Sequence, residues 1–185
     1  MFLPIVAYGD PVLRKKAVDI DKNYPGLEKL IDDMFETMEK SKGVGLAAPQ
    51  INKSIRLFII DSTKMYEDDE EHKGVREVFI NAEIVKETGT EWKYEEGCLS
   101  IPGIREDVSR KPVIKVKYLD RNFKTQEKEF DDMNARVIQH EYDHIEGKLF
   151  IDHIKPLRRS LIKGKLEKIS KGDVDVSYRM KYPKK

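Results

Sequence analysis

The sequence predicts an α+β fold, in which mixed or antiparallel strands pack around a central helix with two histidines, and further helices lie towards the N- and C-terminal ends. Three observations predict it. Apolar residues recur at helical spacing in three segments, short β-branched or alternating runs fill the middle, and no internal repeat or low-complexity linker divides the 185 residues. A chain of this length buries one core, so we expect a single domain over residues 1–185.

Three amphipathic segments predict the helices. The first follows a turn at residues 24–26, with Gly43 near its C-cap and apolar residues at Leu27, Leu30, Ile31, Met34, Phe35 and Met38. The second begins at the N-cap carboxylates of Asp131 and Asp132 and stops at Gly147. The third is expected from about 156 to 169 and is followed by a polar tail over residues 171–185.

Short runs of strand-forming residues lie between the first two helices. They cover residues 55–60, 78–80, 82–85 and 113–119, and each is bounded by Gly, Pro, Asn or Asp. The acid-rich stretch 66–73 interrupts them and is expected to be an exposed loop.

Composition excludes several classes of protein. The formal net charge of +1 supplies no overall field for a phosphate backbone, and no apolar run approaches the roughly 20 residues that span a bilayer. The mean hydropathy of -0.62 indicates a soluble protein. One cysteine cannot form an intramolecular disulfide, and the N-terminus lacks the features of a targeting peptide, so we expect a cytoplasmic protein with no membrane association.

The most specific motif is H-E-x-x-H, at His140, Glu141 and His144 on the second helix. Four residues turn a helix by about 400°, so both imidazoles project from one face and can bind one metal ion. Glu141 is placed to act on water as a general base without being a ligand. The extension that would supply a third histidine fails, because position 150 is Phe.

The third ligand has one good candidate in Cys98, the only cysteine, which lies between Gly97 and a proline-containing turn. A single cysteine is more often a small buried apolar residue, but the paired histidines favour a ligand. A second small-residue run, 43–50, ends in Gln50, whose amide could stabilise a developing oxyanion, although such a run also suits simple core packing.

Two other readings remain open from the residues alone. A zinc endopeptidase or another metal-dependent amide hydrolase would keep H-E-x-x-H, but it would leave the cysteine and glutamine motifs unexplained. A non-catalytic structural zinc module would need four protein ligands, and the remaining histidines, His72 and His153, have no clear place in such a site.

Together, the segments G-V-G-L-A-A-P-Q, E-G-C-L-S-I-P and Q-H-E-Y-D-H, in this order, resemble the three signature motifs of the peptide deformylases. The resemblance implies a hydrolase that removes the formyl group from the N-terminal N-formylmethionine of newly synthesised polypeptides and releases formate. It is expected to use one divalent metal ion, ferrous iron (Fe2+) in most of the family, with Zn2+, Ni2+ or Co2+ as substitutes.

The resemblance also implies roles for individual residues. Cys98, His140 and His144 would bind the metal, and Glu141 would act as general acid and base. The Gln50 side chain and the Leu99 backbone N–H would hold the oxyanion. The substrate-binding residues would be Val44, Gly45, Gly97, Arg105, Met133 and Val137.

Two further expectations concern charged residues. Arg136 falls on the substrate face of the second helix, and we expect its stem to line the pocket rim while its guanidinium stays in water. The last helix carries a basic cluster that could dock on anionic ribosomal RNA or be an ordinary solvated face, formed by Arg158, Arg159, Lys163, Lys165 and Lys168.

Overall fold

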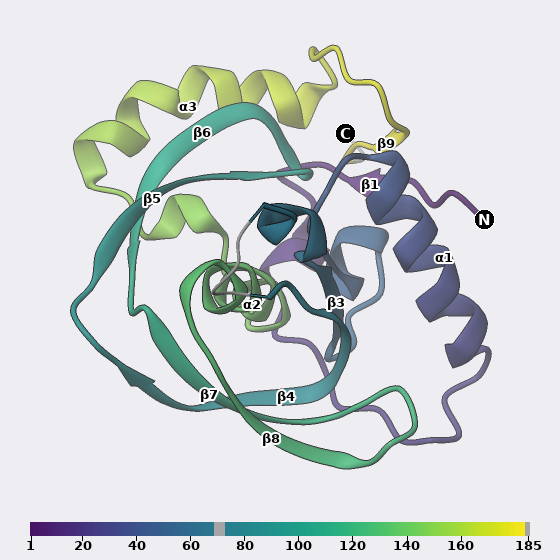
Figure 1. The fold of residues 1–185 in the computed structure, drawn as a ribbon. Coiled ribbons are helices and arrows are strands. Elements are labelled where there is room, and N and C mark those ends of the chain that lie inside the picture. Colours follow the sequence, from purple (N-terminus) through teal and green to yellow (C-terminus); the bar gives the residue numbers. More distant parts are fainter. Residues whose placement is uncertain (69–72, 184–185) are drawn as a thin grey trace.

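The computed structural model describes residues 1–68 and 73–183 and has the predicted α+β architecture. Figure 1 shows the α2 helix near the centre, surrounded by strands, with α1 and α3 on the outside. The helices are α1 (Leu27–Lys40), α2 (Asp132–Ile145) and α3 (Pro156–Lys171). Short 3-10 turns lie at Pro11–Arg14, Ala48–Ile51, Thr63–Tyr66 and Phe150–Asp152.

Antiparallel pairing dominates the sheets of the described residues. Five strands form one sheet in the order β2-β3-β4-β7-β8, a β5-β6 hairpin forms a second, and β1 pairs with β9 in parallel. The strands of the large sheet are β2 (Gly45–Ala47), β3 (Leu57–Asp61), β4 (Arg76–Thr88), β7 (Val113–Leu119) and β8 (Thr125–Phe130). The others are β1 (Ile5–Val6), β5 (Trp92–Cys98), β6 (Ile101–Arg110) and β9 (Met180–Lys181).

The buried face of α2 joins the large sheet to the rest of the molecule. Ala135, Val137, Ile138 and Ile145 pack in one cluster with apolar residues of β3, β4 and β7. The apolar stripe of α1 packs against the same sheet, and α3 packs against β6 in a third cluster. Burial of apolar area is the main stabilising term in folding. Apolar packing therefore holds α2 in place from several sides, independently of the contacts of its polar residues.

Several expected boundaries need correction. The runs at 78–80 and 82–85 belong to one strand, β4, which is irregular at Asn81, where φ is +50°. The left-handed residue after α1 is Lys42, and Gly43 follows it. Asp131 is the N-cap of α2, but its side chain makes no capping hydrogen bond.

The exposed loop expected at 66–73 was wrong at its first residue. Tyr66 is buried, and its hydroxyl donates to the Asp132 carboxylate over 2.9 Å. Residues 69–72, including His72, lie outside the described residues. The polar tail also departs from the expectation, because Met180–Lys181 pairs with β1. Along the described parts of the chain, no helix combines the length and the apolar character needed to cross a bilayer.

Candidate active site

The two histidines of α2 and the cysteine of β5 lie together. The rings of His140 and His144 are 5.2 Å apart between centroids, and His144 Nε2 lies 3.4 Å from Cys98 Sγ. One ligand atom from each of the three residues lies within 4.8 Å of the other two. The helix supplies both imidazoles from one face, as the spacing predicts, while the end of a strand 42 positions earlier in the chain supplies the sulfur.

The local backbone explains why Cys98 reaches this point. The β5-β6 pairing is regular as far as Gly97, which opposes Arg105, and then shifts so that Cys98 opposes Ile101. Such an irregularity re-aims the following side chain. The thiol is therefore presented at the end of the hairpin, towards α2.

Glu96 fixes the orientation of the His140 ring. Its Oε2 lies 2.9 Å from His140 Nδ1, which leaves Nε2 of that imidazole available to a metal. Arg110 and Arg136 both donate to the Glu96 carboxylate, at 2.7 and 3.0 Å. Burial alone would raise the pKa of Glu96, but His140 and Arg110 outweigh it and hold that pKa far below its usual range. In the sequence, Glu96 is visible only as the first residue of the E-G-C-L-S-I-P segment.

The donor set fits a divalent cation. Burial would raise the pKa of the Cys98 thiol, but His144 and His140 lower it to about 5, so the sulfur is a thiolate at neutral pH. Burial would lower the pKa of His140, but Cys98 and Glu96 raise it well above its usual value. The thiolate brings a negative charge to the site, which a bound cation would neutralise. A thiolate and two imidazoles suit zinc or iron and leave positions for water or substrate.

The described residues offer no fourth ligand to this cluster. His153 lies elsewhere, with Nε2 2.7 Å from the Asp143 carboxylate, which in turn accepts from Arg110 over 2.8 Å. A closed four-ligand structural site is therefore not formed by the residues that the structure describes.

Glu141 lies beside the cluster and is nearly fully buried. Its Oε2 has no hydrogen-bond partner among the described residues, and burial raises its pKa to about 7. A Cβ at position 45 would lie 2.5 Å from Glu141 Oε1, so glycine at this position leaves room for the carboxyl. A carboxyl group with a pKa near neutrality is suited to both accepting and returning a proton.

Gln50 and Leu99 also lie next to Cys98. Gln50 Oε1 accepts from the Ala47 N–H over 2.9 Å, which orients the amide so that Nε2 points at Cys98 Sγ, 3.4 Å away, and at Ser100 Oγ, 3.3 Å away. Leu99 follows the cysteine directly. The structure thus brings the amide donor and the loop bearing the Leu99 N–H to the metal-ligand cluster.

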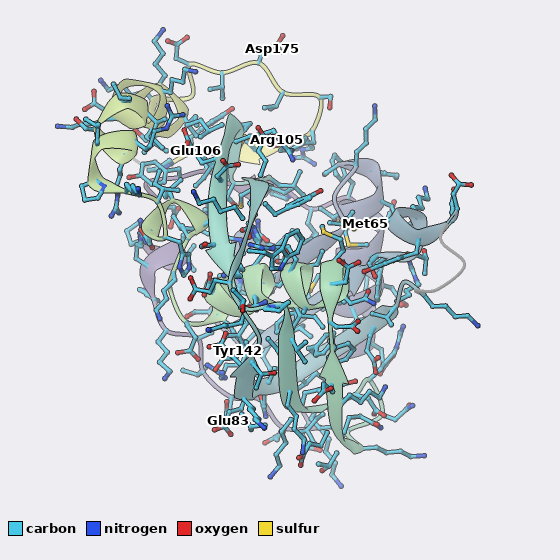
Figure 2. All side chains as sticks on the ribbon, turned by 60° about the vertical axis from the view of Figure 1, so that its left-hand side comes forward. Met65, Glu83, Arg105, Glu106, Tyr142 and Asp175 are labelled. Atoms are coloured by element: carbon cyan, nitrogen blue, oxygen red, sulfur yellow. The ribbon has the colours of Figure 1, made fainter. Side chains whose placement is uncertain are left out.

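A cleft of about 680 Å³ opens onto these residues. All six expected substrate-binding residues line it, namely Val44, Gly45, Gly97, Arg105, Met133 and Val137. Figure 2 labels Arg105 and a further lining residue, Met65, which come from separate parts of the chain. Sequence reasoning did not identify Met65, or the segment 175–178 of the tail, as part of this wall.

Arg136 lines the cleft as expected, but the expectation that its guanidinium stays in water was wrong. Its guanidinium is buried, with the side chain 3% exposed, and it donates to Glu96 and to the carbonyls of Val108 and Trp92. It also stacks over the Trp92 ring at 4.4 Å. The acidic and aromatic partners lie about 40 positions away in the sequence, so helix periodicity alone placed this charge in water.

An α+β fold with a clustered Cys-His-His donor set beside a buried glutamate, opening onto a cleft, defines a metallohydrolase. The model of the family "Polypeptide deformylase" matches residues 2–160. A peptide deformylase of Cytophaga hutchinsonii is 57% identical over 183 residues, covering 99% of this chain and 98% of that protein. One of Christiangramia forsetii is 54% identical over 190 residues, covering 99% and 97%.

A solved structure of a peptide deformylase from Legionella pneumophila aligns with a TM-score of 0.80 at 40% identity, covering 94% of this chain and 98% of that one. This chain belongs to the polypeptide deformylase family. Its activity is peptide deformylation, the hydrolysis that removes the formyl group from N-terminal formylmethionine. Because the chain belongs to this family, the two alternative interpretations, a peptidase and a structural zinc module, are rejected.

Proposed function

We propose that Cys98, His140 and His144 hold one divalent metal ion and that ferrous iron is the native one. The observation that carries the ligand assignment is the convergence of one donor atom from each of the three residues within 4.8 Å, with Cys98 and His140 lining the cleft. When bound, the cation supplies Lewis-acid chemistry, lowering the pKa of water and polarising the formyl carbonyl. The choice of iron rests on the resemblance to the family, because the donor set suits zinc equally well.

In this proposal Glu141 carries out both proton transfers. Its carboxylate takes a proton from the water that attacks the formyl carbon, and later returns it to the amide nitrogen as the C–N bond breaks. Formate and a free N-terminal amine result. The unpartnered, buried Oε2 and the raised pKa support this role, since no described group competes for the oxygen and the carboxyl can change protonation near neutral pH.

Gln50 and Leu99 stabilise the oxyanion in this proposal. As the carbonyl carbon becomes tetrahedral, the Gln50 Nε2–H and the Leu99 backbone N–H donate to its oxygen. The Gln50 amide is already oriented by the Ala47 N–H, so little reorganisation is needed during the reaction. A donor of this kind is typically worth about a hundredfold or more in kcat.

The cleft accommodates the peptide in an extended conformation. The backbone of Val44, Gly45 and Gly97 offers hydrogen bonds along its two walls, and Met133 and Val137 on α2 line the pocket for the methionine side chain. Arg105 contacts the peptide farther along. Its guanidinium is paired with Glu95 at 2.8 Å and exposed, so it can exchange partners at low cost.

Metal analysis tests the ligand assignment. Protein purified anaerobically is expected to contain about one iron per chain, and Cys98→Ala, His140→Ala and His144→Ala should each lose it while keeping the circular-dichroism spectrum. His153→Ala is the matched control, because His153 lies outside the cluster, and it should retain the metal. Retention by the three ligand variants would contradict the assignment, and zinc as the sole occupant would contradict the choice of iron.

We also propose that the protein is cytoplasmic and that residues 1–185 form a single domain.

A further proposal is that α3 docks on the ribosome through its basic cluster. Two of the five residues of this cluster are ion-paired, Arg158 with Glu106 and Arg159 with Asp152, each at 2.8 Å. Lys163, Lys165 and Lys168 remain exposed for contact with anionic RNA. Reversing these three charges should weaken co-sedimentation with ribosomes, whereas reversing the exposed Lys22, Lys53 and Lys64 should not. Equal binding by both variants would refute docking through α3.

A further inference from the structure

The C-terminal tail, residues 172–183, returns from α3 to the N-terminal strand. Gly172 ends the helix with φ of +79°, and Figure 1 shows the yellow tail running from α3 to β9 beside β1. Met180 pairs with Ile5 in parallel, and the carbonyls of Arg179 and Lys181 accept from the N–H groups of Ile5 and Ala7, each at 2.9 Å. The far end of the tail is therefore held by backbone hydrogen bonds.

Side chains of the tail also pack against the core. Val174, Met180 and Tyr182 contact the apolar cluster between α3 and β6. The even-numbered residues from 174 to 182 are partly buried and the odd-numbered ones from 173 to 179 are exposed, as in an extended segment that lies on a surface. The segment between its two anchored parts is thus held against the molecule.

That middle segment forms part of the substrate cleft. Asp175, Val176, Ser177 and Tyr178 line the same cleft as Glu141 and two of the proposed metal ligands, Cys98 and His140. Figure 2 shows Asp175 on the tail at the same end of the molecule as Arg105. The match to the family model stops at residue 160, so this wall lies outside the matched region.

Tyr178 reaches from the tail to the catalytic loop. Its hydroxyl donates to the Leu99 carbonyl over 2.7 Å, across 79 positions of sequence. The next residue, Ser100, is held too, with its carbonyl accepting from the Tyr8 N–H at 2.9 Å and its Oγ accepting from Gln50. The Tyr178 hydroxyl thus ties the Leu99 carbonyl to the tail and restrains the backbone at Leu99.

We propose that Tyr178 is a positioning residue for deformylation, acting through the Leu99 backbone to keep the Leu99 N–H aimed at the oxyanion. The inference rests on the proposed role of Leu99. A hydrogen bond that fixes a donor in place adds to transition-state stabilisation, because the donor need not reorganise as charge develops. In this proposal the tail contributes to the active site, and its other cleft-lining residues face the bound peptide.

Tyr178→Phe removes only the hydroxyl and tests this role. The matched control is Tyr182→Phe, which removes a hydroxyl from the same tail that makes no hydrogen bond to the catalytic loop. With formyl-Met-Ala-Ser as substrate, Tyr178→Phe should lower kcat about three- to tenfold and leave KM nearly unchanged. Tyr182→Phe should match the wild type, and all three proteins should keep the same metal content.

The outcomes separate this role from a structural one. Equal kcat for the two variants, a rise in KM without a fall in kcat, or loss of metal in Tyr178→Phe would each overturn the proposal. Gln50→Ala, measured in parallel, reports on the oxyanion site itself. A fall in kcat for Gln50→Ala alone would reject the positioning role of Tyr178 and keep the proposed chemistry, whereas no fall in either variant would reject both.

Discussion

Glu96 Oε2 lies 2.9 Å from His140 Nδ1 and is itself held by two buried arginines, so the ring orientation of a metal-ligating residue depends on charges outside the cluster. A carboxylate in this position fixes the tautomer of the imidazole and raises its basicity towards a cation. The network extends from Glu96 through Arg110 to Asp143 and His153.

Glu96→Gln is expected to weaken metal binding about ten- to hundredfold, because the amide keeps the volume of the carboxylate but loses its charge. Competition with a chelator at fixed pH measures the effect. Glu95→Gln serves as the control, since Glu95 is exposed and pairs with Arg105 at 2.8 Å. An unchanged dissociation constant for Glu96→Gln would show that Glu96 only balances the arginines.

Gly45→Ala is expected to lower kcat/KM about a hundredfold, because the added Cβ would lie 2.5 Å from Glu141 Oε1 and must displace the carboxyl. Gly164→Ala is the control, since a Cβ there meets nothing within 4 Å. That substitution in α3 should leave activity unchanged and raise the free energy of unfolding by about 0.5–1 kcal/mol. Full activity of Gly45→Ala would mean that Glu141 works from another position.

The three helices could be predicted from the sequence because each has an apolar stripe that contacts a sheet. Sequence periodicity missed β5 because Trp92–Cys98 has only one buried residue and no apolar alternation. It missed β6 although alternate residues of the segment 104–110 are buried, because two of them, Glu106 and Arg110, are charged. Both strands are stabilised by their pairing with each other in the hairpin, and not by a local preference of their residues for strand conformation.

The metal ligands could be predicted because H-E-x-x-H is a local helical pattern and the chain has a single cysteine. The partners of Arg136 and Tyr178 could not, because each bond joins residues 28 to 79 positions apart. Such contacts depend on how the hairpin, α2 and the tail pack together. Motifs therefore indicated the groups that are proposed to react, while the groups that orient them required the structure.

Asp152 is expected to contribute to stability in a pH-dependent way. Burial would raise its pKa, but Arg14, the Leu149 N–H and Arg159 outweigh it and hold the pKa below the ordinary value of 3.8. A lowered pKa in the folded state stabilises the fold above pH 3.8 and loses that contribution as pH falls through the folded-state pKa. Asp152→Asn should thus be less stable than the wild type at neutral pH.

Urea unfolding of both proteins between pH 2.5 and 7, a range of about 4.5 pH units, measures the difference. The gap in free energy should be constant above about pH 5 and shrink below 3.8. Asp175→Asn, at an exposed position of the tail, should show no such gap. A gap that persists unchanged into acid would mean that the ion pairs of Asp152 are not its source.

The most direct test of the proposed mechanism is formate release from formyl-Met-Ala-Ser by the iron-loaded protein and by Glu141→Gln, with metal content measured in both. The glutamine keeps the size of the side chain but cannot take up a proton, so kcat should fall by about a hundredfold or more while the metal stays bound. Turnover near the wild-type rate in a metal-replete Glu141→Gln variant would contradict the role of Glu141 as general base and acid.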